Sequence, residues 1–396
     1  MDTNYLRQNA DWYESQLKDN IMPFWLKYGL DRENGGVYTC LDRDGTLMDK
    51  TKSVWFQGRF GYTAAYAYNN IERNPEWLAA SKYCIDFIEA HCIDPKDKHM
   101  YFSVTSEGAP LRKRRYVFSD CFAAIAMAEY AKASGDRSYA DKALSTFKHI
   151  RWMLETPGFL EPKGYGAGRS HSITMILVNV AIVLKQVCED SALDEQIRDS
   201  ADAIERFFMH PEFECILESV GMDGSLIDTC EGRTINPGHG IETAWFLMQV
   251  AELMDRPHYK ELGLKIFDWQ YKWGWDETFG GIINFRDCKG FPHQDYSQDM
   301  KFWWPQCETV IASLYAYKAT RDEKYLEIYK KTHEWIVKHL VDSEYGEWFG
   351  YLHRDGTVAQ AAKGNLFKGP FHIPRMLTIA QILIKDIISE TNNKSI

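Results

Sequence analysis

A short pattern recurs along this chain at nearly constant spacing, and the repeat limits the folds that the chain can form. Each copy is a short apolar or aromatic run followed by a glycine turn such as Asp-Gly or Lys-Gly, which is typical of a β-hairpin. Copies begin near residues 36, 100, 215, 281 and 348. The long gap after residue 100 is close to two periods, so a sixth copy is expected near 158–168. The chain therefore reads as six units of about 60 residues.

A second pattern, offset from the first, is a short polar turn with an aromatic residue just after it. The aromatic residues that follow these turns are Trp77, Tyr139, Tyr259 and Tyr325. Helical periodicity lies on both sides of each turn. Such a turn joins two antiparallel helices, and the aromatic side chain packs between them.

Together the two patterns predict twelve helices joined alternately by short turns and long hairpin loops. The expected helices are 4–28, 55–70, 76–92, 118–133, 138–154, 171–187, 192–209, 240–254, 258–273, 303–319, 323–340 and 371–390. Six helical hairpins that close on themselves form an (α/α)6 barrel, an all-α fold with short β-hairpins in the long loops at one end. No Pro/Gly/Ser linker divides the chain, so residues 1–396 are expected to form one domain. A pocket is expected where the long loops gather.

Composition and charge exclude several classes of function. The net charge is −10 and the longest basic run is four residues, so no nucleic-acid partner is expected. No apolar leader and no run of about 18 apolar residues occurs, so neither a signal peptide nor a membrane span is expected. The nine cysteines include no CxxC pair, which favours free thiols in a reducing compartment, the cytoplasm. Aromatic residues make up 14% of the chain, which suits either a large core or a cleft that stacks on sugar rings.

Four segments in which a long loop runs into a helix carry most of the candidate functional residues. Each has Gly or Pro near the helix start and His, Glu, Arg or Trp in the first turn. These segments are 52–59, 236–242, 300–308 and 367–375. Since all four follow long loops, their first turns should line the same end of the barrel.

His239 and His372 are the leading candidates because they occupy equivalent places in two repeat units. Either one alone could simply cap a helix. His171 starts another helix at the same end and is a weaker candidate for the pocket. Most of the other histidines, such as His99 and His333, are expected on turns or solvated faces.

Arg59 and Glu308 each lie one helical turn after a tryptophan, Trp55 and Trp304 respectively. A buried arginine needs an acceptor, so these two could also be partners in a structural salt bridge. The doublet Trp303-Trp304 points in two directions on a helix, so only one of the two needs to face a pocket.

Two histidines suit the transfer of a proton to and from carbon, because an imidazole serves as base or acid near neutral pH. Epimerisation beside a carbonyl group requires one group to remove a proton and another to return it on the opposite face. The intermediate is an enolate, which the cation of Arg59 would stabilise. Glu242 or Glu308 could orient an imidazole or bind substrate hydroxyls.

The four segments, together with the likeness along the whole chain, resemble the N-acylglucosamine 2-epimerase family, which includes the renin-binding protein of animals. The resemblance implies an (α/α)6 barrel, often a homodimer, that interconverts N-acetylglucosamine and N-acetylmannosamine, a step of sialic acid salvage. It also implies that the ring opens and that His239 and His372 exchange the proton on C2. Arg59 and Glu308 match residues that the family needs for activity, and Trp55, Glu242 and Arg375 match further pocket positions.

Related branches of the family, cellobiose 2-epimerases and aldose–ketose isomerases such as those acting on mannose, often carry one more histidine. This chain has Met175 at that place, with His171 one turn earlier, which favours the N-acylglucosamine branch and leaves the role of His171 open. No cofactor is expected to be required. Several members are activated by a nucleotide such as ATP, and the Gly-rich basic loop 162–169 is a candidate for binding it, although it is not a Walker motif.

Three other classes remain open on the sequence. His239, Glu242, Glu308 and His372 could coordinate Zn or Mn in a metal-dependent isomerase. Several (α/α)6 barrels cleave glycosidic bonds, which usually requires a pair of carboxylates. A non-catalytic binding protein is the third class.

Overall fold

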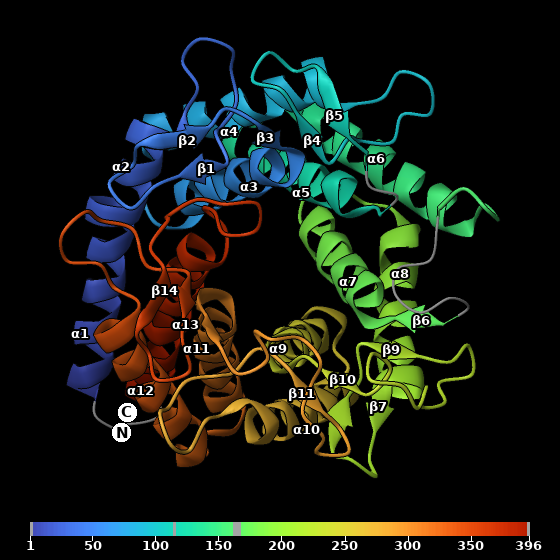
Figure 1. Cartoon of the computed structure of the whole chain (residues 1–396), viewed down its shortest axis with the longest axis vertical. Coiled ribbons are helices and arrows are strands. Elements are labelled where there is room, and N and C mark those ends of the chain that lie inside the picture. The colour runs from blue at the N-terminus through green and yellow to red at the C-terminus, as the bar shows by residue number, and fades with distance from the viewer. Residues whose placement is uncertain (1–2, 114–115, 161–167, 394–396) are drawn as a thin grey trace.

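The computed structural model describes residues 3–113, 116–160 and 168–393, and its helices form two concentric rings (Figure 1). The inner ring consists of α3 (Val54–Asn70), α5 (Phe118–Ser134), α7 (His171–Lys185), α9 (Pro237–Met254), α11 (Trp303–Thr320) and α13 (His372–Asn393). The outer ring consists of α1 (Thr3–Ser15), α4 (Pro75–Phe87), α6 (Arg137–Glu155), α8 (Ser191–Ala203), α10 (Pro257–Gly274) and α12 (Glu323–His339).

Three outer helices continue beyond these bounds in π-helical turns. α1 runs on through η1 (Gln16–Ile21), α2 (Met22–Phe24) and η2 (Trp25–Gly29), α4 runs into η3 (Ile88–Cys92), and α8 runs into η4 (Ile204–Phe208). In the described part of the chain this makes twelve continuous helical segments, at the positions expected from the repeats.

The inner ring is closed. Each inner helix packs against the next, from α3 through α5, α7, α9 and α11 to α13, and α13 packs against α3. Five hairpins are joined by short turns, and the sixth forms between the two ends of the chain, where α1 packs against α13. The predicted (α/α)6 barrel is therefore confirmed.

Local sequence explains why the hairpins turn where they do. Gly135, Asp255 and Arg321 adopt positive φ angles directly after α5, α9 and α11, the left-handed conformation that ends a helix. Asp136 and Asp322 then accept a backbone N–H at the start of the next helix. These adjacent stop and start signals turn the chain back within two or three residues.

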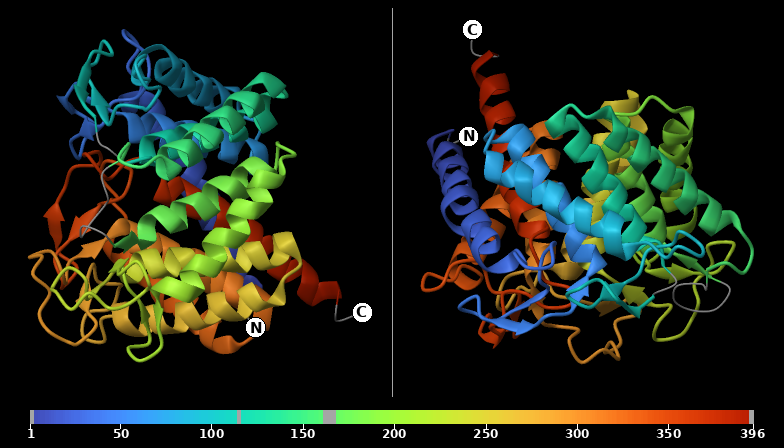
Figure 2. Two further views of the ribbon diagram at one scale, coloured as in Figure 1. Left: turned by 90° about the vertical axis from the view of Figure 1, so that its right-hand side faces the viewer. Right: turned by 90° about the horizontal axis from the view of Figure 1, so that it is seen from above.

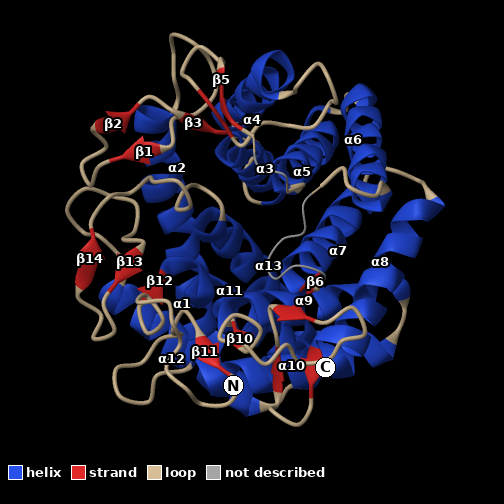
Figure 3. Cartoon of the chain, turned by 45° about the vertical axis from the view of Figure 1, so that its right-hand side comes forward, coloured by secondary structure: helices blue, strands red, loops and turns tan. Residues whose placement is uncertain are grey.

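All the described strands lie in the long loops, on one face of the barrel (Figures 2 and 3). The strands are β1 (Cys40–Leu41), β2 (Leu47–Asp49), β3 (Lys52–Ser53), β4 (Ser103–Val104), β5 (Pro110–Arg112), β6 (Arg169–Ser170), β7 (Met209–His210), β8 (Cys215–Ile216), β9 (Ser219–Val220), β10 (Thr234–Ile235), β11 (Arg286–Asp287), β12 (Lys301–Phe302), β13 (Tyr351–Leu352) and β14 (Val358–Gln360). Figure 2 shows the end of α13 projecting from the opposite face.

The strands link successive units around this face. The strand before an inner helix pairs with a strand of the next unit, as in β3 with β4, β6 with β9, β10 with β11 and β12 with β13, all antiparallel. A bridge between Leu41 and Gly364 connects the last unit to the first. The sixth hairpin copy, expected near 158–168, lies largely outside the described residues.

Buried ion pairs hold the loops in register beneath these strands. Lys301 Nζ donates to Asp276 Oδ2 at 3.0 Å and to the Gly280 carbonyl, and five residues later Gln306 bonds both backbone groups of Ile282. Lys52 and Gln57 make the corresponding contacts in the first unit. In both units a lysine and a glutamine five residues later bind the preceding loop. The same arrangement of hydrogen bonds therefore fixes the loop geometry at two helix starts.

His99 and His333 are buried rather than solvated: His99 Nδ1 lies 2.9 Å from Asp120 Oδ2, and His333 Nδ1 lies 2.9 Å from Tyr13 Oη. The expectation for these two was wrong, because their partners lie on other helices. All nine cysteines are free, and no helix in the described part of the chain is long and apolar enough to cross a membrane.

Candidate active site

A cavity of about 490 Å³ opens at the loop end of the inner ring. Every inner helix contributes to its wall near its first turn. The lining residues are Trp55, Arg59, Phe118, Phe122, Ser172, Met175, Ile176, Asn236, His239, Glu242, Asn284, Phe285, Phe302, Trp303, Trp304, Tyr351, Phe367, Phe371, His372 and Arg375. Eight of the ten residues expected at a site are among them. The other two, Glu308 and His171, lie directly behind the wall in contact with lining residues.

His372 is held from behind by a carboxylate. It is the first residue of α13, and its Nδ1 lies 2.7 Å from Glu308 Oε1 on α11. Burial, followed by the charge of Arg375, lowers the pKa of His372 well below its usual value, so the imidazole is neutral near pH 7. With Nδ1–H donated to Glu308, the ring leaves Nε2 with a free lone pair.

Arg375 takes the place that the sequence had suggested for Arg59. Its Nη2 donates to Glu242 Oε1 at 2.5 Å and to Glu308 Oε1 at 2.8 Å. Trp245 Nε1 donates to the other Glu308 oxygen at 2.9 Å. A structural ion pair of Glu308 therefore exists, but its partner is Arg375, one turn after His372 on the same helix.

His239 has a carboxylate behind it as well. Asn236 caps α9 by accepting the backbone N–H of His239, and Pro237 occupies the first helical position. His239 Nδ1 lies 2.9 Å from Glu218 Oε1. Burial raises the pKa of Glu218, but the nearby His239 and His171 outweigh it, so the net shift is downward and Glu218 is ionised. Both imidazoles thus share one arrangement, a carboxylate at Nδ1 and Nε2 left for a ligand.

Glu218 was missed from the sequence. It lies between β8 and β9, where its backbone N–H donates to the Thr234 carbonyl and its own carbonyl accepts from the His171 N–H. The segment between β8 and β9 is therefore bonded both to the start of α7 and to β10, which precedes α9, and it brings one carboxylate to both histidines. The only signal was its place in the repeated loop pattern, which also contains other acidic residues.

Arg59 lies among aromatic rings. Its guanidinium carbon is 4.3 Å from the Phe122 ring centroid, 4.9 Å from that of Phe371 and 5.1 Å from that of Trp55. Among the described residues it pairs with no carboxylate, and its buried Nε has no hydrogen-bond partner. Burial lowers the pKa of Arg59, but a guanidinium remains charged at neutral pH. This leaves a cation on the cavity wall with unused donors for an anionic oxygen.

Both tryptophans of the doublet line the cavity. The Trp304 ring centroid is 5.1 Å from that of His239 and 5.7 Å from that of His372, so this indole lies beside both imidazoles. Trp303 packs on Tyr351 and lies 6.2 Å from the His372 ring. Both indole rings therefore line the cavity, although the sequence required only one of them to face it.

The arrangement of charges bears on the classes that the sequence left open. Glu242 and Glu308 are both engaged by Arg375, so neither is a free acid or nucleophile for glycoside cleavage. The same guanidinium occupies the position that a metal would need between Glu242, Glu308 and His372. This part of the site suits proton transfer. The nucleotide loop expected at 162–169 lies, apart from its last two residues, outside the described residues.

The chain is similar to known sugar epimerases along most of its length. Residues 36–368 match the family model described as N-acylglucosamine 2-epimerase (GlcNAc 2-epimerase). The N-acylglucosamine 2-epimerase of Bos taurus is 35% identical over 94% of this chain and 90% of its own, and that of Homo sapiens is 32% identical over 96% and 91%. A cellobiose 2-epimerase of Ruminococcus albus is 25% identical over 91% of this chain and 95% of its own.

Solved structures support the fold. Cellobiose 2-epimerase from Bacillus thermoamylovorans superposes with a TM-score of 0.85 at 20% identity, over 96% of this chain and all of its own. A D-mannose isomerase gives 0.80 at 19% identity, over 95% and 97%. An α-mannanase of Bacteroides thetaiotaomicron gives 0.66 at 11% identity, over 98% and 100%.

Proposed function

The chain belongs to the N-acylglucosamine 2-epimerase family and is a carbohydrate epimerase; from that premise we propose that it interconverts N-acetylglucosamine and N-acetylmannosamine. The relatives at 32–35% identity carry this activity in their names, whereas the cellobiose 2-epimerases are more distant, at 22–25%. The chain also spans about nine tenths of the length of those nearer relatives.

The observation that carries the proposal is the pair of carboxylate-backed imidazoles on one cavity. In the open-chain sugar, the C1 carbonyl makes the C2 proton acidic. Nε2 of one histidine removes that proton, and the other histidine returns a proton to the opposite face of C2. Glu308 and Glu218 bind Nδ1 of the two rings, and both histidines line the cavity.

Arg59 is assigned to the enolate oxygen. Charge develops on O1 as the C2 proton leaves, and a cation with unused donors stabilises that charge without reorganising. The aromatic rings around the guanidinium keep water away from it, which strengthens the interaction. Trp304, Trp303 and Trp55 supply apolar faces for the C–H groups of the sugar.

No step of this mechanism requires a metal or a redox cofactor, since protons move only between imidazoles and carbon. A nucleotide such as ATP would act as an activator and not as a reactant. We also propose a cytoplasmic homodimer acting in sialic acid salvage. Light scattering should then give about twice the 46.0 kDa of one chain.

Deuterium exchange at C2 tests the proposal. In heavy water with chelator present, N-acetylmannosamine should gain deuterium at C2 as it epimerises, while cellobiose and mannose should not. His239→Ala and His372→Ala should each lower epimerisation about 10³-fold or more, since general acid–base catalysis contributes about 10²–10⁴-fold.

Each single variant should still exchange the C2 proton of one epimer, because one base remains on one face. Retention of full epimerase activity in either variant would refute the two-histidine mechanism. Exchange with cellobiose but not with N-acetylmannosamine would refute the substrate assignment.

A further inference from the structure

The two clusters of histidine and carboxylate at the site differ in one respect, the presence of a cation. Glu242, Glu308 and His372 surround the guanidinium of Arg375. The charge of Glu218, in contrast, is paired with the imidazoles of His171 and His239, and among the described residues no lysine or arginine forms an ion pair with it. The cluster of His171, Glu218 and His239 is therefore the one in which no arginine or lysine among the described residues already occupies the place of a bound cation.

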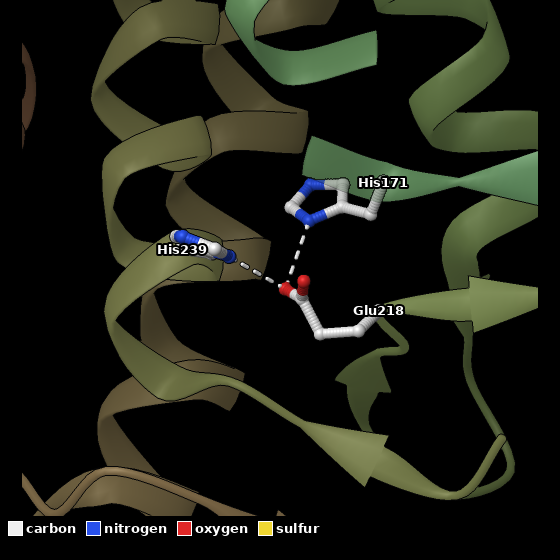
Figure 4. A group of neighbouring side chains, drawn as sticks. All are labelled: His171, Glu218 and His239. Carbon is white, nitrogen blue, oxygen red and sulfur yellow. Dashed lines mark hydrogen bonds and ion pairs between the residues drawn. The ribbon is translucent and has the colours of Figure 1, made fainter. Parts of the chain in front are cut away.

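The geometry of this cluster suits a metal ion (Figure 4). His171 and His239 both direct Nδ1 at the same oxygen of Glu218, at 3.4 and 2.9 Å. One ligand atom from each residue lies within 4.8 Å of the others. Zinc bonds of about 2.0–2.2 Å in tetrahedral geometry place ligand atoms about 3.3 Å apart, so small side-chain shifts would complete the site. Two histidines and one glutamate are a common protein ligand set for zinc with an open position.

The surroundings of the cluster support ligand binding. Thr243 Oγ1 lies 3.0 Å from His171 Nε2, and a hydroxyl either donates to this nitrogen or accepts from it, so the contact persists when the ring changes tautomer. A hydrogen bond to the second nitrogen is the usual support of a metal-bound imidazole. His171 is fully buried, whereas Glu218 and His239 remain partly accessible, so a cation can reach the cluster from outside.

Access is provided by a second cavity of about 680 Å³, next to the first, with Glu218 on its wall. Glu231 and Asp295 also line it, and Phe285 borders both cavities. An acidic cavity concentrates cations.

We propose that His171, Glu218 and His239 form a zinc site whose occupation blocks epimerisation. Zinc takes the Nδ1 lone pairs, so the proton of each neutral imidazole moves to Nε2, and an imidazolium would release one proton to solvent. His239 Nε2 then carries hydrogen and has no lone pair for the C2 proton. The inhibition rests on the role proposed above for His239, whereas the zinc binding does not.

The test uses untagged full-length protein carrying Cys230→Ser, because Cys230 is an exposed thiol that would itself bind zinc. Zinc is titrated in a chelator-buffered series, and bound metal and epimerase activity are measured on the same samples. We expect one zinc per chain, loss of activity with the same midpoint, and recovery on adding EDTA. The melting temperature should rise with zinc concentration.

Three variants locate the site. Glu218→Gln and His171→Asn should each weaken zinc binding at least about 10-fold, because even an outer partner of a metal ligand contributes that much. His258→Asn is the matched control, since it removes a surface pair of His258 and Glu205 and should leave both binding and activity unchanged.

Two results would overturn the proposal. The first is the absence of stoichiometric binding, or binding unchanged in Glu218→Gln and His171→Asn; the epimerase mechanism would survive this, since the exchange experiment tests it without metal. The second is zinc bound at this cluster with full activity, which would also count against His239 as a base.

Discussion

Glu308 accepts three hydrogen bonds from other residues of the site. One of its oxygens accepts from His372 Nδ1 and from Arg375, and the other accepts from Trp245. All three partners are donors, and the side chain is fully buried. Only an ionised carboxylate, which has acceptors on both oxygens and no hydrogen of its own, satisfies all of them.

Glu308→Gln should therefore be damaging although it is nearly isosteric. The amide places an N–H against a donor in either orientation and leaves that group unpaired in a buried site. We expect kcat to fall about 100-fold, since hydrogen bonds to charged groups are worth about 1.5–3 kcal/mol. Steady-state kinetics and circular dichroism measure the loss and the retention of fold. Trp245→Phe, which removes only one donor, is the matched control and should lose far less; equal losses would contradict this account.

His333 makes the stability of the protein depend on pH. Burial lowers the pKa of His333 to about 4, and its ring shares a hydrogen bond with the Tyr13 hydroxyl. The unfolded chain protonates near pH 6.5, before the folded state does. Stability from this group is therefore fully present above pH 6.5 and is lost as the pH falls toward 4, by up to about 3 kcal/mol.

Unfolding by urea at pH 7, 5.5 and 4.5 tests this dependence. His333→Gln keeps a hydrogen-bonding side chain without a titrating group. The midpoint for the wild type should fall more steeply with acid than that of the variant. Parallel curves for the two proteins would show that His333 does not titrate in this range.

At the scale of single elements, glycines set how closely the helix starts approach one another. A Cβ on Gly238 would lie 2.4 Å from Trp304 Cζ3, and a Cβ on Gly369 would lie 2.2 Å from the Phe56 ring. Each glycine lies within one of the four site segments, Gly238 directly before His239 and Gly369 three residues before His372. The close approach of α9 to α11 therefore determines where the Trp304 indole lies between the two imidazoles.

Gly238→Ala should displace the Trp304 ring and lower kcat about 10-fold or more while the fold persists, because a misplacement of about 1 Å can cost 10²-fold. Trp304→Phe provides a smaller ring at the same place. The double variant should be less impaired than the two single losses together predict, since the smaller ring makes room for the new methyl group. Strict additivity in kcat would mean that the two residues do not interact.

At the scale of the whole molecule, the barrel is a ring of six equivalent hairpins in which one hairpin is built from both chain ends. Helix α1 and its continuation η1 pack against α13, and their buried residues include Leu6 and Leu17. Helix α1 starts and helix α13 ends on the face away from the long loops (Figure 2). We therefore expect that the site does not depend on which hairpin of the barrel contains the two chain ends.

A circular permutant should fold and stay active. The two ends would be joined by a Gly/Ser linker of about 15 residues, which spans about 20 Å. New ends would be placed at the exposed turn between Gly135 and Asp136, far from the loop face. We expect kcat and KM within about threefold of the wild type, measured by the same exchange assay. A permutant that folds but has lost activity would show that an intact α5–α6 turn is required for the site.

Much of the fold and part of the site could be predicted because their signals are local. Helix limits follow from periodicity and from caps such as Asp136 and Asp322, and a loop running into a helix marks a first turn that faces the cavity. Eight of the ten expected residues do line one cavity, as those local rules imply. What each residue does there stays a prediction until the experiments above are done.

Partner choice could not be predicted, because it depends on residues far apart in the chain. Arg59 and Glu308 were plausible partners in the sequence, yet Arg375 binds Glu308 and Arg59 lies among aromatic rings. Glu218 reaches two histidines only because the segment between β8 and β9 lies beside two helix starts.

The sequence by itself determined the twelve helices, their closure into six units and the segments that line the cavity, since these depend on neighbouring residues and a repeating period. Only the tertiary structure decided which carboxylate binds which imidazole and where the Arg59 guanidinium lies. It also decided that Arg375 pairs with the cluster around His372 and not with the cluster around His239. The contacts of the three carboxylates Glu218, Glu242 and Glu308 join residues separated by 21 to 133 positions. Their energies depend on burial and distance, which no local pattern encodes.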